Sequence, residues 1–354
     1  MKAKKVEAYS TKCSSCGDNM IFSPDAKALV CHSCSQKKAI DVDANVDSHP
    51  VLVNEETVKI KNSEWASSQK NMNCPNCGAI VSLPSYDTTA TCPYCESHLT
   101  ANKEERDGLK PDGIIPFAFG KEKAHELFKN KIKSNWLTPR SLKKQISADV
   151  IHAYYFPAFV FNASCFSSYN GRLYKNYTTK ASDGRTVTER RYFSISGEIT
   201  SNHSGIEIEA STRLSQTELT SVRPYLFKKA VKFSEEYTLG FVQECHSDSV
   251  EECYPKAQGI IKNEIRDLIL KKYDYDGVQS LKIDTDFNNP TFSYYSLPMY
   301  RMNYTYKNKQ YSNVMNGQTG SLGGKVPKSP FKICLIVIAI LAIILLPFLL
   351  VALL

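Results

Sequence analysis

The sequence lacks the short motifs that mark several large enzyme classes. The nearest approach to a GxxxxGK[ST] phosphate loop is residues 323–326, GGKV, which has neither the leading glycine nor the following Ser or Thr. His125-Glu126 is followed by Lys129 where HExxH needs its second histidine, and no GxSxG elbow occurs. These absences argue against a P-loop ATPase, a zincin protease and an α/β-hydrolase. We therefore expect a protein that is not an enzyme.

The amino end also lacks a secretory signal, because residues 1–13 are basic but no apolar stretch follows them. The composition does not indicate disorder, since 42% of residues are hydrophobic and 23% charged, close to globular averages. The net charge of +8 is mild for 354 residues. It fits a surface near anionic lipid as well as one that binds nucleic acid, and decides neither.

Charge is absent from the last 22 residues, 333–354, which form an unbroken apolar run. As a helix this run would be about 33 Å long, enough for a hydrocarbon core of about 30 Å. Lys325, Lys328 and Lys332 precede it, and by the positive-inside rule the rest of the chain stays cytoplasmic. The pattern predicts a C-terminal transmembrane helix, and with it a tail-anchored, single-pass protein of the cell membrane that contacts the lipid bilayer.

Cysteine is plentiful, with twelve in the chain. In a reducing cytosol clustered cysteines more often bind metal than form disulfides. Eight of them form two copies of a CxxC…CxxC pattern, each with fourteen residues between the pairs and separated by an offset of 61. The first copy is Cys13, Cys16, Cys31 and Cys34, and the second is Cys74, Cys77, Cys92 and Cys95.

This spacing predicts two zinc ribbons. A CxxC pair aims two thiolates at one point, Gly17 and Gly78 supply permissive backbone after the first pair, and hairpin-forming residues separate the pairs. Four thiolates fill the tetrahedral coordination of zinc, so the two ions are expected to be structural rather than catalytic. Four thiolates do not choose between metals, and a rubredoxin-type iron site stays an alternative.

The rest of the chain predicts an α+β domain with antiparallel strands. An amphipathic helix is expected at 121–136 with Trp136 on its buried face, a second helix at 249–272, and several short strands, among them 278–283, 292–296 and 299–306. The expected order is zinc ribbon 1 (1–38), a polar linker (39–70), zinc ribbon 2 (71–101), a linker (102–113), the α+β domain (114–320), a juxtamembrane linker (321–332) and the transmembrane helix (333–354).

Several of these features together resemble a known family. They are the paired CxxC ribbons, the Tyr-Phe-Pro segment at residues 155–157, the NGQTG of residues 316–320 and the terminal apolar run. The chain resembles bacterial membrane-anchored proteins with tandem transcription factor IIB-type zinc ribbons, sometimes labelled primosomal-helicase-like. The resemblance implies a membrane partner of phage-shock protein A in envelope stress, acting with a flotillin-like protein. Pairing of the middle domain with a second membrane protein is an expectation of the adaptor hypothesis below.

Two functions follow as hypotheses. The first is a non-enzymatic membrane adaptor that recruits cytoplasmic proteins through its ribbons. The second is a nucleic-acid binder related to transcription or replication factors, which needs a basic and aromatic surface. The ribbons offer only Lys12, Lys27, Lys37 and Lys38 in the first copy and almost no Lys or Arg in the second, so the adaptor is favoured.

Overall fold

The computed structural model describes the backbone over most of the chain. The described residues are 12–41, 51–53, 69–84, 89–95, 97–100, 109–145, 150–180, 185–211, 214 and 216–353. Most of the two predicted linkers, 39–70 and 102–113, lies outside them.

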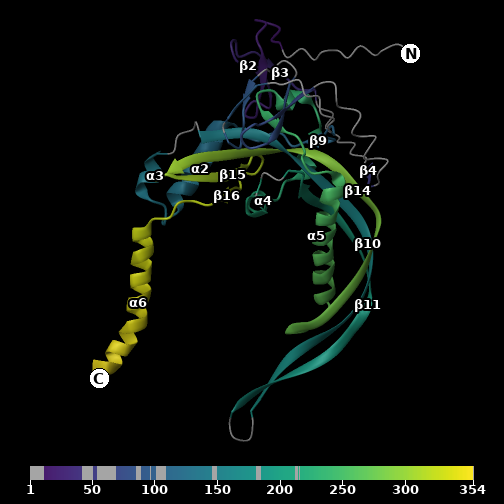
Figure 1. Ribbon diagram of the computed structural model, residues 1–354, viewed down its shortest axis with the longest axis vertical. Coiled ribbons are helices and arrows are strands. Elements are labelled where there is room, and N and C mark those ends of the chain that lie inside the picture. The colour runs from purple at the N-terminus through teal and green to yellow at the C-terminus, as the bar shows by residue number, and fades with distance from the viewer. Residues whose placement is uncertain are drawn as a thin grey trace.

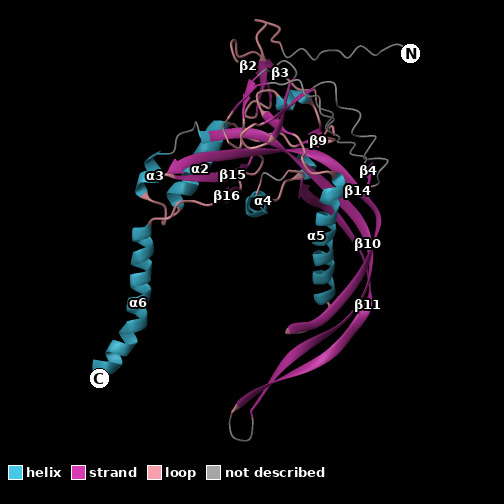
Figure 2. Cartoon of the chain, viewed as in Figure 1, coloured by secondary structure: helices cyan, strands magenta, loops and turns pink. Residues whose placement is uncertain are grey.

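The described strands form three sheets, one large and two small (Figures 1 and 2). The first ribbon is a three-stranded sheet of β1 (Met20–Ser23), β2 (Ala28–Cys31) and β3 (Lys37–Lys38). In the second ribbon β7 (Thr89–Thr91) pairs with β8 (His98–Thr100). The large sheet comprises β4 (Val51–Leu52), β5 (Gln69–Asn73), β6 (Ile80–Pro84), β9 (Gly113–Ile114), β10 (Ile151–Lys180), β11 (Thr186–Glu209), β12 (Val231–Lys232), β13 (Val242–Glu244), β14 (Gly277–Tyr306), β15 (Lys309–Asn316) and β16 (Leu322–Gly324).

Three long strands, β10, β11 and β14, give the molecule its arched shape (Figure 1). β10 lies between β11 and β14 and pairs antiparallel with both. Residues 154–161 of β10, all aromatic or apolar, form a continuous buried run, whereas residues 163–170 alternate between buried and exposed. The first part of β10 therefore lies inside the core with both faces covered. Beyond it the strand continues with only one face covered by other elements.

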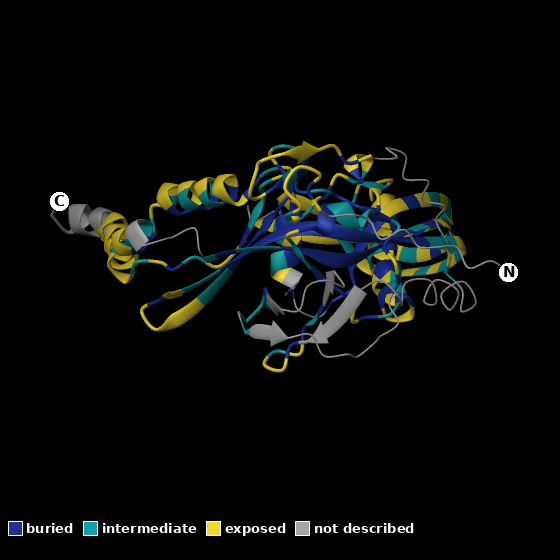
Figure 3. Cartoon of the chain, turned by 90° about the horizontal axis from the view of Figure 1, so that it is seen from above, coloured by how far each residue is buried: buried dark blue, intermediate teal, exposed yellow. Residues whose placement is uncertain are grey.

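The helices cover the sheet at separate places, and buried residues concentrate where helix and sheet meet (Figure 3). α5 covers the inner face of the arched strands (Figure 1). It begins with a capping box in which Ser249 and Glu252 bond each other's backbone N–H groups, and it buries Ala257, Ile261 and Ile265. The helices are α2 (Lys121–Ser134), α3 (Arg140–Gln145), α4 (Gln216–Val222), α5 (Val250–Leu270) and α6 (Pro330–Leu353), with short 3-10 helices η2 (Phe227–Lys229) and η3 (Glu235–Thr238).

The predicted fold class is wrong in two respects, and the first concerns the sheet. The large sheet is mixed rather than antiparallel, because β9 runs parallel to β14 and β13 runs parallel to β10. The two added strands are two and three residues long and lie far in sequence from their parallel partners. Such short pairings leave no periodicity in the sequence from which a parallel register could be predicted.

The second correction concerns the transmembrane helix. Among the described residues, no helix combines the length and the apolar character needed to cross a membrane. The prediction of a tail anchor, and with it that of a single-pass membrane location, is therefore not supported.

Candidate metal centres

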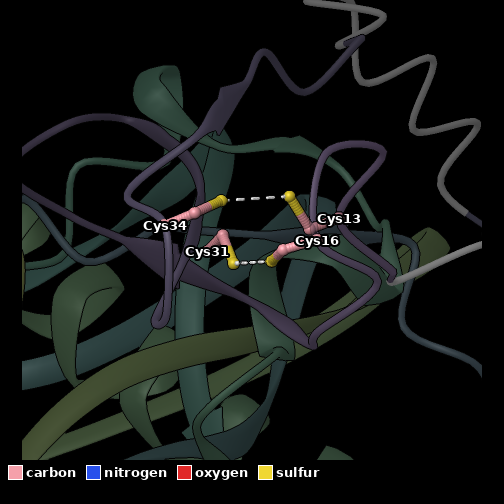
Figure 4. A group of neighbouring side chains, drawn as sticks. All are labelled: Cys13, Cys16, Cys31 and Cys34. Atoms are coloured by element: carbon pink, nitrogen blue, oxygen red, sulfur yellow. Dashed lines mark hydrogen bonds between the residues drawn. The ribbon is translucent and has the colours of Figure 1, made fainter.

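Each predicted set of four cysteines comes together in the fold, and Figure 4 shows the first set. In both sets the four Sγ atoms all lie within 4.8 Å of one another. The Sγ atoms of Cys13 and Cys34 are 3.4 Å apart, as are those of Cys16 and Cys31. In the second set the corresponding distances are 3.5 Å between Cys74 and Cys95 and 3.6 Å between Cys77 and Cys92.

These distances fit a four-sulfur metal site and not a disulfide. A disulfide would bring two sulfurs to about 2.05 Å, and all eight cysteines are unpaired in that sense. Four sulfurs at about 2.3 Å from one zinc ion lie about 3.8 Å from each other, close to the separations found here. Each set can therefore hold one metal ion with all four coordination positions filled by the chain.

The same backbone geometry builds both sites. The N–H of Gly17 donates to the carbonyl of Cys13 at 2.9 Å, and that of Gly78 to the carbonyl of Cys74 at 2.7 Å. Both glycines have a φ near +70°, a left-handed conformation that glycine adopts without the usual cost. The 61-residue repeat in the sequence is thus a repeat in structure, and each CxxC turn directs its two thiols at the metal position.

The backbone of the first turn also favours thiolate formation. The N–H groups of Cys16 and Ser15 hydrogen-bond the sulfur of Cys13 and lower the pKa of its thiol to about 6, whereas neighbouring thiols of the set raise the pKa values of Cys16 and Cys34. A thiolate is the form that binds metal. Within this set the backbone hydrogen bonds therefore favour the thiolate at Cys13.

Ribbon 1 (residues 12–41) docks through its hairpin and leaves its metal-binding turns outside. Phe22 of β1 is buried against Tyr237 of η3, with ring centroids 5.1 Å apart, and its N–H donates to the carbonyl of Leu239 at 3.0 Å. Asp25 accepts a hydrogen bond from the N–H of Gly120 at 3.1 Å. On the opposite side Cys16 and Cys34 are exposed, together with His32 between the second pair of ligands.

Ribbon 2 (residues 69–84, 89–95 and 97–100) docks the other way, through both a strand and its metal-binding turn. β6 pairs antiparallel with β13 and thereby extends the large sheet. Tyr94, which lies between Cys92 and Cys95, packs edge-on against Tyr154 at 5.4 Å. Its hydroxyl donates to the carboxylate of Glu244, and the guanidinium of Arg301 lies 4.7 Å from the centre of its ring.

Sequence reasoning missed these partners of ribbon 2. Glu244 and Arg301 lie 149 and 206 residues after Cys95, in strands β13 and β14, and nothing in their neighbourhood marks them. Tyr94 carried a weak signal, since it replaces the small Ser33 at the equivalent position of ribbon 1. A large aromatic residue inside a metal-binding turn needs a surface to cover it.

The other four cysteines take no part in the two four-sulfur sets. Cys165, Cys245 and Cys253 are buried, as expected of small apolar residues, and Cys334 is exposed on α6. His32 is exposed beside the first site and forms no part of its four-sulfur cluster. The side chain of His98 is outside the described residues.

Comparison with known proteins places the chain beside one uncharacterised bacterial protein. It is 25% identical over 325 residues to the uncharacterized protein YdjG of Bacillus subtilis (strain 168), and the match covers 92% of each chain. No family model matches the chain. No solved structure matches it either. The chain is therefore similar along almost its whole length to a protein whose name states no activity.

Proposed function

We propose that the chain is a non-enzymatic, protein-binding scaffold organised by two structural zinc ions. What carries the proposal is the contrast between the two metal-binding turns. Ribbon 2 uses its turn to attach to the domain, whereas ribbon 1 attaches by its hairpin and presents its turn, with Ser15, His32 and Ser33, to solvent. Zinc is favoured over iron because a structural ribbon with four cysteine ligands is a common use of zinc in proteins. Partner recognition by ribbon 1 would then depend on the metal that shapes this turn.

The open edge of the large sheet supports the same proposal. Within the described residues β11 pairs only with β10, so one edge of a 24-residue strand is free of a neighbouring strand. Such an edge can accept a partner segment as an added strand. The resemblance noted above makes a phage-shock protein A-like or flotillin-like protein the first partner to test.

A crosslinking experiment tests the scaffold. A photoreactive amino acid at His32, on the exposed turn of ribbon 1, should crosslink to a discrete protein in cells, and the product should disappear when Cys13→Ser removes a ligand. The same amino acid at Asn130, exposed on α2, is the control. The scaffold hypothesis fails if His32 gives no protein adduct beyond the control, or if the adduct persists without the ligand.

Nucleic-acid binding remains a second candidate because of a surface outside the ribbons. At the distal end of the β10–β11 hairpin, Arg172 lies 5.1 Å from the ring centre of Tyr192 and Arg190 lies 4.9 Å from that of Tyr174. Tyr174 and Tyr192 are directly opposite in register, so they share a face. Residues 172–191 contain six Lys or Arg and two Asp or Glu. Basic side chains beside aromatic rings are the usual means of binding single strands.

A titration distinguishes this second function. A fluorescent single-stranded oligonucleotide should bind with an affinity that falls as salt rises, by about 0.7 log units per log unit of salt for each phosphate neutralised. The double variant Arg172→Ala, Arg190→Ala should flatten this dependence, while Lys121→Ala, Lys123→Ala on α2 should not. Equal salt dependence in both variants would remove the hairpin from consideration.

A further inference from the structure

A cavity of about 370 Å³ lies where the end of β11 meets α4 and the first half of α5. Its walls carry apolar side chains, among them Ile208, Leu214, Leu219 and Ile260. Glu209, Arg223, Asp248 and Lys256 add charge to the same lining. Five polar or charged residues and four apolar ones share the lining, and the volume is within the range of sites that bind small organic ligands. None of these residues belongs to the metal centres.

The two bases of the lining are already neutralised within the chain. Arg223 donates through Nη2 to the backbone carbonyl of Glu207 at 2.6 Å and lies 3.4 Å from that residue's Oε1. Lys256 donates to Asp248 Oδ2 at 2.7 Å. An anionic ligand would have to compete with these internal acceptors, so the bases are poorly placed to recruit one.

Glu209 is the charged residue of the lining that these pairings do not include. Its side chain is only 7% exposed, yet its Oε1 is buried with no hydrogen-bond partner in the described part of the chain. Burial is the main cause that raises the pKa of its carboxyl to about 9, and the negative charge of Glu244 adds to the shift. Arg223 and Arg301 act in the opposite direction but do not reverse the shift. A buried carboxyl without a partner is costly, and that cost is relieved by a ligand that brings a hydrogen-bond donor and a positive charge.

A metal ion does not fit this need. The carboxylates here do not form a cluster with metal-ligand spacing, since within the described residues the groups close enough for that are the two cysteine sets. Glu244 is committed to the hydroxyls of Tyr94 and Ser211. The unfilled requirement is therefore a single cationic donor next to an apolar wall.

We propose that this cavity binds a small primary amine, with the ammonium group on Glu209 and a short apolar body against Leu214, Leu219 and Ile260. Its ammonium would lie against the carboxyl of Glu209, and its carbon chain would fill the space between α4 and α5. This site is separate from the metal centres, and does not depend on the scaffold function proposed above.

Three probes with one five-carbon skeleton test the proposal on the full-length, zinc-loaded chain. They are 3-methylbutylamine, 3-methylbutanol and 3-methylbutanoate, and calorimetric titration measures their affinities. We expect the amine to bind at least tenfold more tightly than the alcohol, and the carboxylate to bind least. Glu209→Gln should reduce amine affinity at least tenfold, while Glu251→Gln, an exposed acid on α5, should leave it unchanged.

A second variant tests the cavity itself. Ile260→Phe places a larger side chain in the apolar wall without altering charge, and should abolish amine binding in a chain that still folds and holds two metal ions. Equal binding of amine and alcohol, tighter binding of the carboxylate, an unaltered affinity in Glu209→Gln, or no amine binding at millimolar concentration would each overturn the proposal.

Discussion

The hydroxyl group of Tyr94 stabilises the junction between ribbon 2 and the α+β domain. It donates to the buried carboxylate of Glu244, whose other oxygen accepts from Ser211. Tyr94→Phe keeps the ring against Tyr154 and Arg301 but leaves the carboxylate short of a donor. We expect the free energy of unfolding to fall by about 1–3 kcal/mol. Denaturant titration measures it, with metal content checked in parallel.

Tyr192→Phe is the matched control for this substitution. Tyr192 is 42% exposed on the hairpin arm, so its hydroxyl can be hydrated, and the same loss of an oxygen should change stability by less than about 0.5 kcal/mol. Equal losses of unfolding free energy at the two positions would show that the hydrogen bond from Tyr94 to Glu244 does not stabilise the junction.

Glu209 makes a second prediction at this scale, concerning pH. Its carboxyl has a pKa of about 9 in the fold against 4.5 for the free side chain, mainly because of burial. Between these values the unfolded chain loses the proton and the folded chain keeps it. The stability of the wild type should therefore fall as pH rises, relative to Glu209→Gln, by up to about 1.4 kcal/mol per pH unit.

Unfolding of both proteins at pH 5, 6.5 and 8 measures this difference. It should widen steadily with pH, and the variant should be the more stable protein at pH 8. Glu251→Gln, on the exposed side of α5, should show no such trend. A constant gap between wild type and Glu209→Gln would mean that the carboxyl ionises normally in the fold.

At the scale of elements, the two candidate metal sites are unequally protected from solvent. Cys16 and Cys34 of ribbon 1 are exposed, whereas Cys77 and Cys95 of ribbon 2 are half-buried and their turn is covered by the domain. A chelator should therefore remove the metal of ribbon 1 first. We expect two release phases with a colorimetric chelator, with the fast phase missing in Cys13→Ser and the slow phase missing in Cys74→Ser.

The elements also show what the sequence could predict. α5 was expected at 249–272 and is found at Val250–Leu270, because a capping box and a 3.6-residue apolar period are local signals. Trp136 was placed on the buried face of the preceding helix and is instead 57% exposed, since α2 ends at Ser134 and the periodicity no longer applies. Three short strands predicted between 278 and 306 are one strand, β14, because polar residues on an exposed face resemble breaks.

At the scale of the whole molecule, the grouping of the cysteines was predictable and the attachment of the ribbons was not. Cysteine spacing is a local pattern that suits tetrahedral coordination, so the two sets of four cysteines that come together could be named from sequence. The pairing of β6 with β13 joins residues 161 or more positions apart, through backbone groups that every sequence has. Ribbons predicted as modules on polar linkers are therefore found packed on one body with the arched sheet.

This attachment predicts how loss of one metal spreads through the molecule. β13 lies between β10 and β6, and the N–H of Cys245 donates to the carbonyl of Ile80 at 3.0 Å. Cys74→Ser should unfold ribbon 2 and increase amide hydrogen exchange at residues 242–245. Cys13→Ser should instead increase exchange at 237–241, where Phe22 packs against Tyr237 and Phe241. Each variant is the control for the other. Exchange confined to the mutated ribbon in both variants would mean that the ribbons fold as independent modules, and that their contacts with the domain carry no stability.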